Sequence, residues 1–198
     1  MRRQRTLLPY TSRAVSILLL AGLAALSPGV RAATASAVDL DGRRVDPLKA
    51  DAGKVVVLIF VRTDCPISNR YAPTIQRISA HYADKAAFWL VYPDKAESPA
   101  EIRKHDEDFG YKIPALRDLD HALVKAARAK ITPEVAVFDA SGQLVYHGRI
   151  DDWYVDFGKS RTQATTHELN DALDAALAGH APAVRVTEAV GCYIADIE

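Results

Sequence analysis

Residues 55–73 read VVVLIFVRTDCPISNRYAP, and this stretch decides the fold. Residues 54–61 are almost wholly apolar and alternate poorly, as expected of a strand buried on both faces of a sheet. From position 66 to position 81 the apolar residues recur every three or four positions, which predicts a helix. One of only two cysteines, Cys65, therefore stands where a buried strand gives way to a helix.

Cys65 is expected to lie at the start of this helix, because Pro66 suits the first helical position. Free backbone N–H groups and the positive end of the helix dipole favour the thiolate there, which is the reactive form of cysteine. Arg62 would favour the thiolate further, and Asp64 would oppose it. The alternative is a structural role as a small apolar residue buried at a strand end. Taken alone, the cysteine leaves both roles open.

The other elements alternate between strand and helix patterns. They are a hairpin over 38–45 with its turn at Asp41-Gly42, a strand over 87–91, a helix over 98–109 with Ser98 as N-cap, a helix over 118–130, a hairpin with strands over 135–138 and 144–146, and a helix that begins with a capping box over 165–168 and ends at Gly179. This order predicts a three-layer α/β fold, with helices on both faces of a mixed sheet.

The composition is that of an ordinary globular protein. Of 198 residues, 49% are hydrophobic and 25% are charged, and the formal net charge is +0. That balance allows a buried core and gives no indication of nucleic-acid binding, which favours a basic patch.

The N-terminus has the features of an export signal. Four arginines precede an apolar run over residues 14–26, and Val30-Arg31-Ala32 supplies a cleavage site. These features predict a signal peptide over residues 1–32, with an uncleaved membrane anchor as the alternative. The mature chain is then expected in the periplasm or outside the cell, where disulfides persist.

Two prolines add to the significance of Cys65. Pro73 lies inside the helix that Cys65 opens, and Thr132-Pro133 begins PEVAVFDASGQLV, residues 133–145, where a cis proline would pack against the cysteine loop. Together with the buried strand, these residues resemble the thioredoxin-like superfamily. More narrowly they resemble its secreted redoxin branch, which holds peroxiredoxin-like (alkyl hydroperoxide reductase-type) proteins and tethered thiol–disulfide reductases. The resemblance implies an α/β/α sandwich over a domain of residues 33–180.

The chain also departs from both relatives. Thioredoxins carry Cys-x-x-Cys, whereas the fourth place here is Ser68. Peroxiredoxins carry Thr or Ser three residues before their reactive cysteine, and that place holds Arg62. The departures weaken the case for peroxidase activity and leave the fold unaffected.

The resemblance implies a role for each of five residues. Cys65 would attack a disulfide or a peroxide, and Cys192 would resolve the product. Ser68 would hydrogen-bond the thiolate. Thr132, before Pro133, would present backbone hydrogen bonds to a bound thiol or peptide.

Cys192 lies in a C-terminal tail, residues 181–198, that is too apolar to be left in solvent. The tail is expected to pack on the domain or to add an edge strand. Two alternatives to a resolving cysteine stay open: a permanent disulfide with Cys65, and an inert thiol distant from it.

The expected partners are protein disulfides, thiols or peroxides and an external thiol reductant, with no nucleic acid, and a membrane only if the signal stays uncleaved. No cofactor is expected. The six histidines are scattered, and Cys65 with His147 is the least unsuitable ligand pair for a metal.

An aromatic cluster follows the second strand of the late hairpin. It either attaches a loop to the core or forms a partner surface, and its members are Trp153, Tyr154 and Phe157. Rival functions are a non-catalytic thioredoxin-like binding module and a copper- or haem-pathway accessory protein.

Overall fold

A computed structural model describes residues 35–195 and 197, and the predicted signal peptide over residues 1–32 lies outside them. The strands are β1 (Ala37–Asp39), β2 (Arg44–Val45), β3 (Val55–Phe60), β4 (Ala86–Tyr92), β5 (Ala115–Arg117), β6 (Ile131–Thr132), β7 (Glu134–Phe138), β8 (Leu144–Gly148), β9 (Tyr154–Asp156), β10 (Lys159–Ser160) and β11 (Cys192–Tyr193). The helices are α1 (Pro47–Ala50), α2 (Pro66–His81), α3 (Pro99–Phe109), α4 (Ala122–Ala127) and α5 (Glu168–Leu177).

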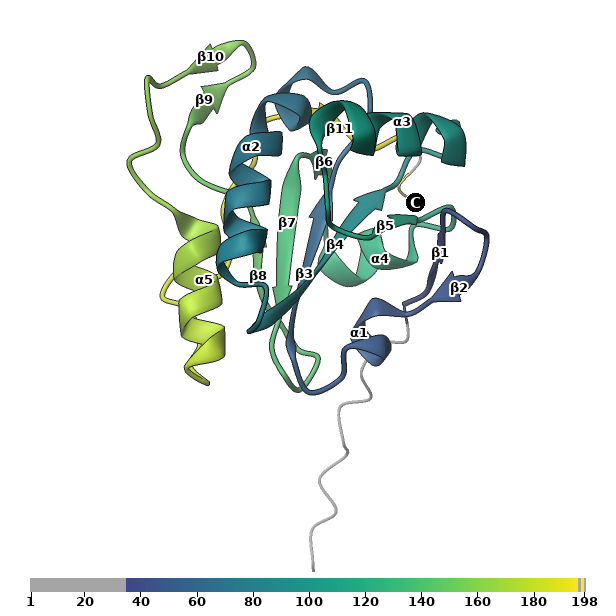
Figure 1. The fold of residues 1–198 in the computed structure, drawn as a ribbon. Helices are drawn as coiled ribbons and strands as arrows, with labels where there is room; N and C mark the ends of the chain where they lie inside the picture. The colour runs from purple at the N-terminus through teal and green to yellow at the C-terminus, as the bar shows by residue number, and fades with distance from the viewer. Residues whose placement is uncertain (1–34, 196, 198) are drawn as a thin grey trace, which may run out of the picture. The chain divides into compact units, whose positions relative to one another are not determined.

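Seven strands form one mixed sheet in the order β2-β1-β5-β4-β3-β7-β8 (Figure 1). Strand β3 runs parallel to β4 and antiparallel to β7, so it is central in the sheet. The predicted hairpin over 38–45 is confirmed, since β1 and β2 pair antiparallel. The remaining four strands form two small two-stranded sheets, β9 with β10 and β6 with β11.

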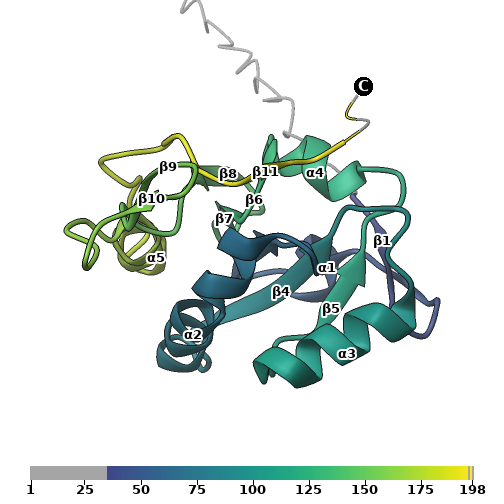
Figure 2. The same ribbon diagram turned by 90° about the horizontal axis from the view of Figure 1, so that it is seen from above.

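Helices cover both faces of the sheet because β3 is apolar at every position. Val57 and Ile59 join the core beneath α2, α3 and α5, whereas Leu58 and Phe60 join the core beneath α4. Helix α4 accordingly lies across the sheet from α2 and α3 (Figure 2). The structure therefore confirms the predicted three-layer α/β/α architecture with its mixed central sheet.

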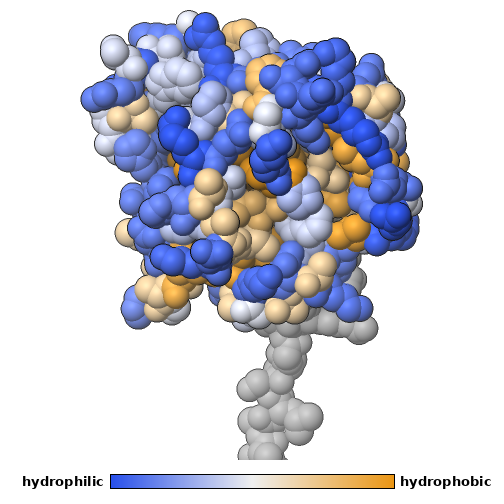
Figure 3. All heavy atoms as spheres, in the orientation of Figure 1, coloured by the Kyte–Doolittle hydropathy of each residue, from blue (hydrophilic) through white to orange (hydrophobic). Residues whose placement is uncertain are grey.

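One groove on the surface has several apolar residues in its lining. A groove of about 700 Å³ runs between the last turns of α2 and strand β4, lined among others by Ala80, Ala83, Phe88 and Trp89. In Figure 3 hydrophobic residues gather in the middle of this face, within a largely hydrophilic surround.

The predicted helix over 118–130 is wrong at both ends. Its first residues follow a strand that the sequence did not predict, β5, which pairs in parallel with β4. The buried Asp118 carboxylate accepts hydrogen bonds from the N–H groups of Ala122 and Val124, so α4 begins only at position 122. Arg128 then ends the helix with a left-handed backbone conformation.

The predicted capping box over 165–168 is also wrong. No side chain caps α5, whose N-cap residue is His167. Glu168 instead pairs with Arg149, and Thr165 donates to Asp152. The side chains of Thr165 and Glu168, which would have formed the local cap, therefore bond to residues more distant in the sequence. The Ser98 cap of α3 is confirmed, with Pro99 as the first helical residue and Glu101 completing a capping box.

The C-terminal tail packs on the domain, as expected, and contributes a short strand. Strand β11 pairs antiparallel with β6, Cys192 lying opposite Thr132. Upstream, Val186 forms a parallel bridge with His147 of β8. Within the described part of the chain, none of the helices has the length and apolar character that crossing a membrane requires.

Candidate active site

Cys65 is the N-cap residue of α2, with Pro66 as the first helical residue. This confirms the predicted position, at the end of a buried strand and the start of a helix. The side chain is 0% exposed. Its Sγ accepts a hydrogen bond from the N–H of Ser68 at 3.5 Å, and its S–H donates to the carbonyl of Thr132 at 3.1 Å.

Thr132 comes to Cys65 on β6, which is 67 residues further along the sequence. The Thr132–Pro133 peptide bond is cis, as the sequence predicted. Thr132 is itself buried, so the contact between its carbonyl and the sulfur is shielded from solvent. The expected juxtaposition of the proline segment and the cysteine loop is therefore present.

The tail brings Cys192 to the same place. Cys192 lies opposite Thr132 in the β6–β11 pair, and Thr132 Oγ1 donates to the Cys192 carbonyl at 3.3 Å. Gly191 makes this approach possible, because a Cβ there would lie 2.0 Å from the Thr132 carbonyl oxygen. Both cysteines are free thiols in this structure.

The two thiols differ in acidity. Burial raises the pKa of Cys65, but hydrogen bonds from Cys192, Ser68 and Thr132 outweigh burial, so that its pKa lies below the ordinary thiol value. Burial raises the pKa of Cys192, and its hydrogen bond to Cys65 raises that pKa further. The pair therefore holds its first negative charge on Cys65 and its proton on Cys192.

The charge of Arg62 stabilises the Cys65 thiolate less than the sequence suggested. Its guanidinium is paired with Asp64 at 3.1 Å and with Asp94 at 3.0 Å, so two carboxylates balance its charge. The largest contributions that lower the pKa of Cys65 come from hydrogen bonds.

Ser68 stands where thioredoxins have their second cysteine, and it is 0% exposed. Its hydroxyl has no partner with hydrogen-bond geometry among the described residues. It nevertheless contributes to lowering the pKa of Cys65, as does its backbone N–H. The Ser68 backbone N–H makes the hydrogen bond to Cys65 Sγ, and a hydrogen bond from its hydroxyl to the thiolate stays a prediction.

Sequence reasoning missed the polar residues that hold the loop in front of Cys65. The N–H of Thr63 donates to the buried carboxylate of Glu97 at 2.6 Å, and Asn69 Nδ2 donates to the Thr63 carbonyl at 2.9 Å. Glu97 gave no signal, because it lies 34 positions from Thr63 in an ordinary loop sequence.

The aromatic residues after β8 pack on the first turns of α2. Tyr71 makes an edge-to-face contact with Trp153 at 5.3 Å and a tilted contact with Tyr154 at 5.9 Å, and its hydroxyl donates to Asp151 at 2.6 Å. Phe157 stays 65% exposed. Two of the three aromatic residues therefore attach the loop to the core, in line with the structural alternative.

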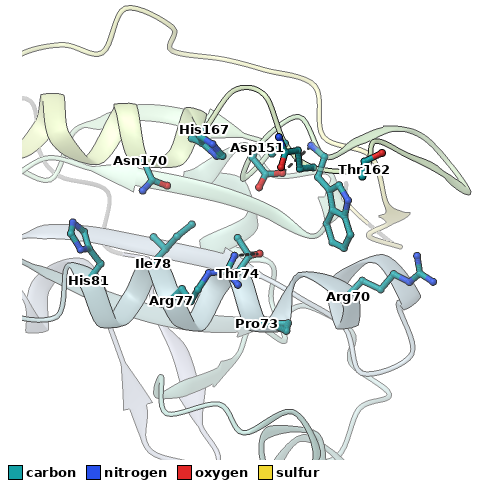
Figure 4. A pocket seen from close by; sticks show the side chains of 13 residues that line it. Arg70, Pro73, Thr74, Arg77, Ile78, His81, Asp151, Thr162, His167 and Asn170 are labelled. Carbon is teal, nitrogen blue, oxygen red and sulfur yellow. Dashed lines mark hydrogen bonds between the residues drawn. The ribbon is translucent and has the colours of Figure 1, made fainter.

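A groove of about 850 Å³ runs along α2 between this loop and the start of α5 (Figure 4). Arg70 lies at the end of the groove nearest the N-terminus of α2, and His81 lies towards the other end. His147, the other suggested metal ligand, contacts Glu134 at 3.4 Å. Among the described residues, no group of three or more His, Cys, Asp or Glu side chains is arranged to hold a metal ion.

Comparison with known proteins agrees with this geometry. The family model described as Redoxin matches residues 27–153. A hypothetical protein from Sinorhizobium meliloti 1021 superposes with a TM-score of 0.71 at 25% identity, over 83% of this chain and 91% of that one. An uncharacterized conserved protein from Geobacillus kaustophilus gives 0.68 at 24% identity, over 80% and 86%.

A third solved structure shares the fold alone. It is a secreted disulfide oxidoreductase of Mycobacterium tuberculosis, homologous to E. coli DsbE, with a TM-score of 0.51 at 18% identity over 74% of this chain and 96% of that one. No curated protein matches the sequence significantly.

Proposed function

Since the chain belongs to the redoxin family of thioredoxin-like proteins, we propose that it is a thiol–disulfide oxidoreductase in which Cys65 is the nucleophile and Cys192 the resolving thiol. One observation carries the proposal: β11 places Cys192 opposite Thr132, and the carbonyl of Thr132 lies 3.1 Å from Cys65 Sγ, so the two thiols meet at one site. The pKa of Cys65 is lowered and that of Cys192 is raised. That difference suits a reaction in which Cys65 attacks first.

The reaction balances with a disulfide as the oxidant. The Cys65 thiolate attacks one sulfur of the substrate disulfide, forms a mixed disulfide and releases the other sulfur as a thiolate. Cys192 then loses its proton and attacks Cys65 Sγ, which releases the second substrate thiolate. The substrate gains two electrons, and the protein keeps a Cys65–Cys192 disulfide that an external thiol reductant must reduce.

Access to Cys65 depends on the tail. The sulfur is 0% exposed, and β11 occupies the side of β6 at which Thr132 would present its backbone to a substrate. We infer that β11 leaves β6 to admit the substrate, and returns to bring Cys192 to the mixed disulfide. Thr132 and Pro133 then position the substrate, as the sequence predicted.

A protein disulfide fits this site better than a peroxide does. Peroxide reduction needs a stabilised charge on the departing oxygen, yet Arg62, the arginine nearest Cys65 in sequence, is already paired with two carboxylates. The proposed compartment is the periplasm or the cell exterior, and its support is the sequence pattern over residues 1–32.

The test maps both cysteines in protein isolated from its own compartment, with thiols alkylated at low pH and identified by mass spectrometry. We expect both thiols to be free at the start and to join after brief treatment with glutathione disulfide. Cys192→Ser should accumulate a glutathione adduct on Cys65. Cys65→Ser, the matched control, should form no adduct on Cys192 at the same exposure.

Two results would overturn the proposal. A disulfide that is present throughout and resists mild reductant would make the pair structural, and the protein a binding module. A Cys65 that stays unmodified in the Cys192→Ser variant would remove the nucleophile. Stoichiometric copper uptake that depends on Cys65 would favour the metal-pathway alternative instead.

A further inference from the structure

A network of hydrogen bonds leads from the Cys65 loop into the protein interior, and no step of the proposed reaction uses it. The Asn69 side chain donates from Nδ2 to the Thr63 carbonyl at 2.9 Å, and its Oδ1 lies 2.9 Å from His105 Nε2. The other ring nitrogen, Nδ1, lies 2.8 Å from the Tyr92 hydroxyl, and the same hydroxyl lies 2.8 Å from Asp106 Oδ1. We call these four residues, Asn69, Tyr92, His105 and Asp106, the His105 network.

Counting donors fixes the tautomer of His105. An amide oxygen can only accept, so Nε2 must carry the proton that it shares with Asn69 Oδ1. The Asn69 amide is held in the matching orientation, because its nitrogen is needed at the Thr63 carbonyl.

The same count limits the protonation states in which all contacts of the His105 network are hydrogen bonds. The Tyr92 hydroxyl has a single hydrogen, but it lies between two potential acceptors, His105 Nδ1 and Asp106 Oδ1. Both contacts are hydrogen bonds only if Nδ1 or Asp106 also carries a proton. The complete network therefore has one proton more than a neutral imidazole beside an ionised carboxylate.

The surroundings favour the neutral forms of both groups. His105 is 5% exposed, and burial lowers its pKa against the opposing effect of Asp108. Burial raises the pKa of Asp106, against the hydrogen bond from Tyr92 and the charge of Arg103. The other titratable groups that face the network are Tyr111, whose ring lies 5.8 Å from that of His105, and Glu97, which acts on Tyr92.

We propose that His105 is a positioning residue for Cys65: its Nε2–H fixes the Asn69 amide, and the amide holds the loop that presents the sulfur at the start of α2. Asn69 reaches this loop twice, because its backbone N–H also donates to the Cys65 carbonyl at 3.0 Å. Without His105, the amide oxygen loses its donor, and the Asn69 side chain is held by its single hydrogen bond to the Thr63 carbonyl. With one anchor in place of two, the side chain no longer fixes the loop. The loop then loses the geometry in which the Ser68 N–H reaches Cys65 Sγ.

The inference rests on the proposed function for its significance, but its test does not need activity. The ultraviolet absorbance of the thiolate, read as the difference between an otherwise unaltered protein and its Cys65→Ser counterpart, gives the pKa of Cys65 directly. We expect His105→Phe to raise this pKa by about 1, because the thiolate loses part of its hydrogen bonding. The thiolate fraction below the midpoint would fall about tenfold.

His105→Gln should restore most of the original pKa, because an amide can donate to Asn69 and accept from Tyr92. Glu107→Ala, an exposed change on the same helix, should leave the pKa unchanged and controls for effects on α3. If His105→Phe has the pKa of the unaltered protein, or if the glutamine variant behaves like the phenylalanine variant, His105 does not position Cys65 through a hydrogen bond.

A second measurement stands even if His105→Phe fails to fold. Imidazole nitrogen NMR on the unaltered full chain should show Nε2 of His105 protonated through the pH range in which Cys65 titrates. A neutral ring with its proton on Nδ1 alone would overturn the inference. A failure of the glutathione experiment described above would overturn the redox function and leave this result untouched.

Discussion

Cys65 and Cys192 differ in acidity because their surroundings differ. The pKa of Cys65 is lowered by hydrogen bonds, among them the one from the Ser68 N–H, whereas burial raises the pKa of Cys192. Two identical thiols therefore differ in the direction that the proposed roles require. Gly191 allows the tail to lie against β6, because it has no Cβ and so leaves room for the Thr132 carbonyl.

Gly191→Ala is expected to separate the tail from the site. The added Cβ would lie 2.0 Å from the Thr132 oxygen, so β11 must lift from β6. We expect Cys65–Cys192 disulfide formation after glutathione disulfide to slow by about tenfold or more, since small displacements of reacting atoms are costly. Mass-spectrometric mapping against time measures the rate.

Glu188→Ala, an exposed change three residues earlier in the same tail, serves as the control and should react at the unaltered rate. An unchanged rate in Gly191→Ala would mean that the β6–β11 pairing does not govern the approach of Cys192.

At the scale of elements, the tail is attached to two different strands. Cys192 pairs with Thr132 on β6, and upstream Thr187 binds around the end of β8. The Thr187 hydroxyl bonds to the Tyr146 hydroxyl at 2.7 Å and accepts from the N–H of Arg149 at 3.0 Å. Gly148 allows this contact, because a Cβ there would lie 2.3 Å from Thr187 Oγ1. The β8 attachment can therefore hold the tail while β11 moves.

Thr187→Val is expected to weaken this attachment while nearly preserving side-chain shape. The change leaves the Arg149 N–H without its partner and removes one partner of the Tyr146 hydroxyl. The free energy of unfolding should fall by about 1–3 kcal/mol, measured by denaturant titration. Val186→Thr, an exposed neighbour, is the matched control and should change stability by less than about 0.5 kcal/mol. Equal stability of Thr187→Val and the unaltered protein would contradict this anchoring role.

In the molecule as a whole, segments far apart in sequence assemble the site on a mixed sheet. The loop after β3, the cis peptide between β6 and β7, and the tail strand β11 meet at Cys65. The global stability of the reduced protein is therefore linked to the ionisation of both thiols.

The reduced protein should have a stability that depends on pH in two opposite ways. The pKa of Cys65 is lower in the folded state, so the unfolded chain binds more protons, and stability rises with pH up to the ordinary thiol pKa of about 8.5. The pKa of Cys192 is raised by folding, so above about pH 8.5 the folded state binds more protons, and this contribution is lost as pH rises.

Denaturant titrations under strong reductant across this pH range measure both effects. The unaltered curve minus the Cys65→Ser curve should keep the rise below about pH 8.5, because the contribution of the other ionisable groups is common to both proteins and cancels. A difference curve that is flat in that range would contradict a lowered Cys65 pKa.

Local physical rules made several features predictable from the sequence. The uninterrupted apolar run at β3 indicated a strand buried on both faces, and Cys-Pro at a helix start indicated the N-cap. The cis proline and the packing of the tail also followed from residue type and position. In each case neighbouring residues carried the information.

The errors fall where distant groups replaced local ones. Asp118 was assigned to a helix, but its carboxylate caps that helix from outside. Glu168 was assigned to a capping box, but Arg149 takes its carboxylate. When a polar side chain has several potential partners, burial and geometry in the folded protein decide which one it bonds to. The sequence pattern does not contain that information.

The sequence by itself determined the mixed α/β architecture and the position of Cys65, because hydrophobic periodicity and helix capping depend on residues close together in the chain. Only the tertiary structure decided which groups meet at the sulfur. Cys192, Thr132 and the His105 network reach the Cys65 loop through sheet pairing and helix packing. Hydrogen bonds and pKa values depend on distances of a few ångströms between residues far apart in sequence, and folding alone sets those distances.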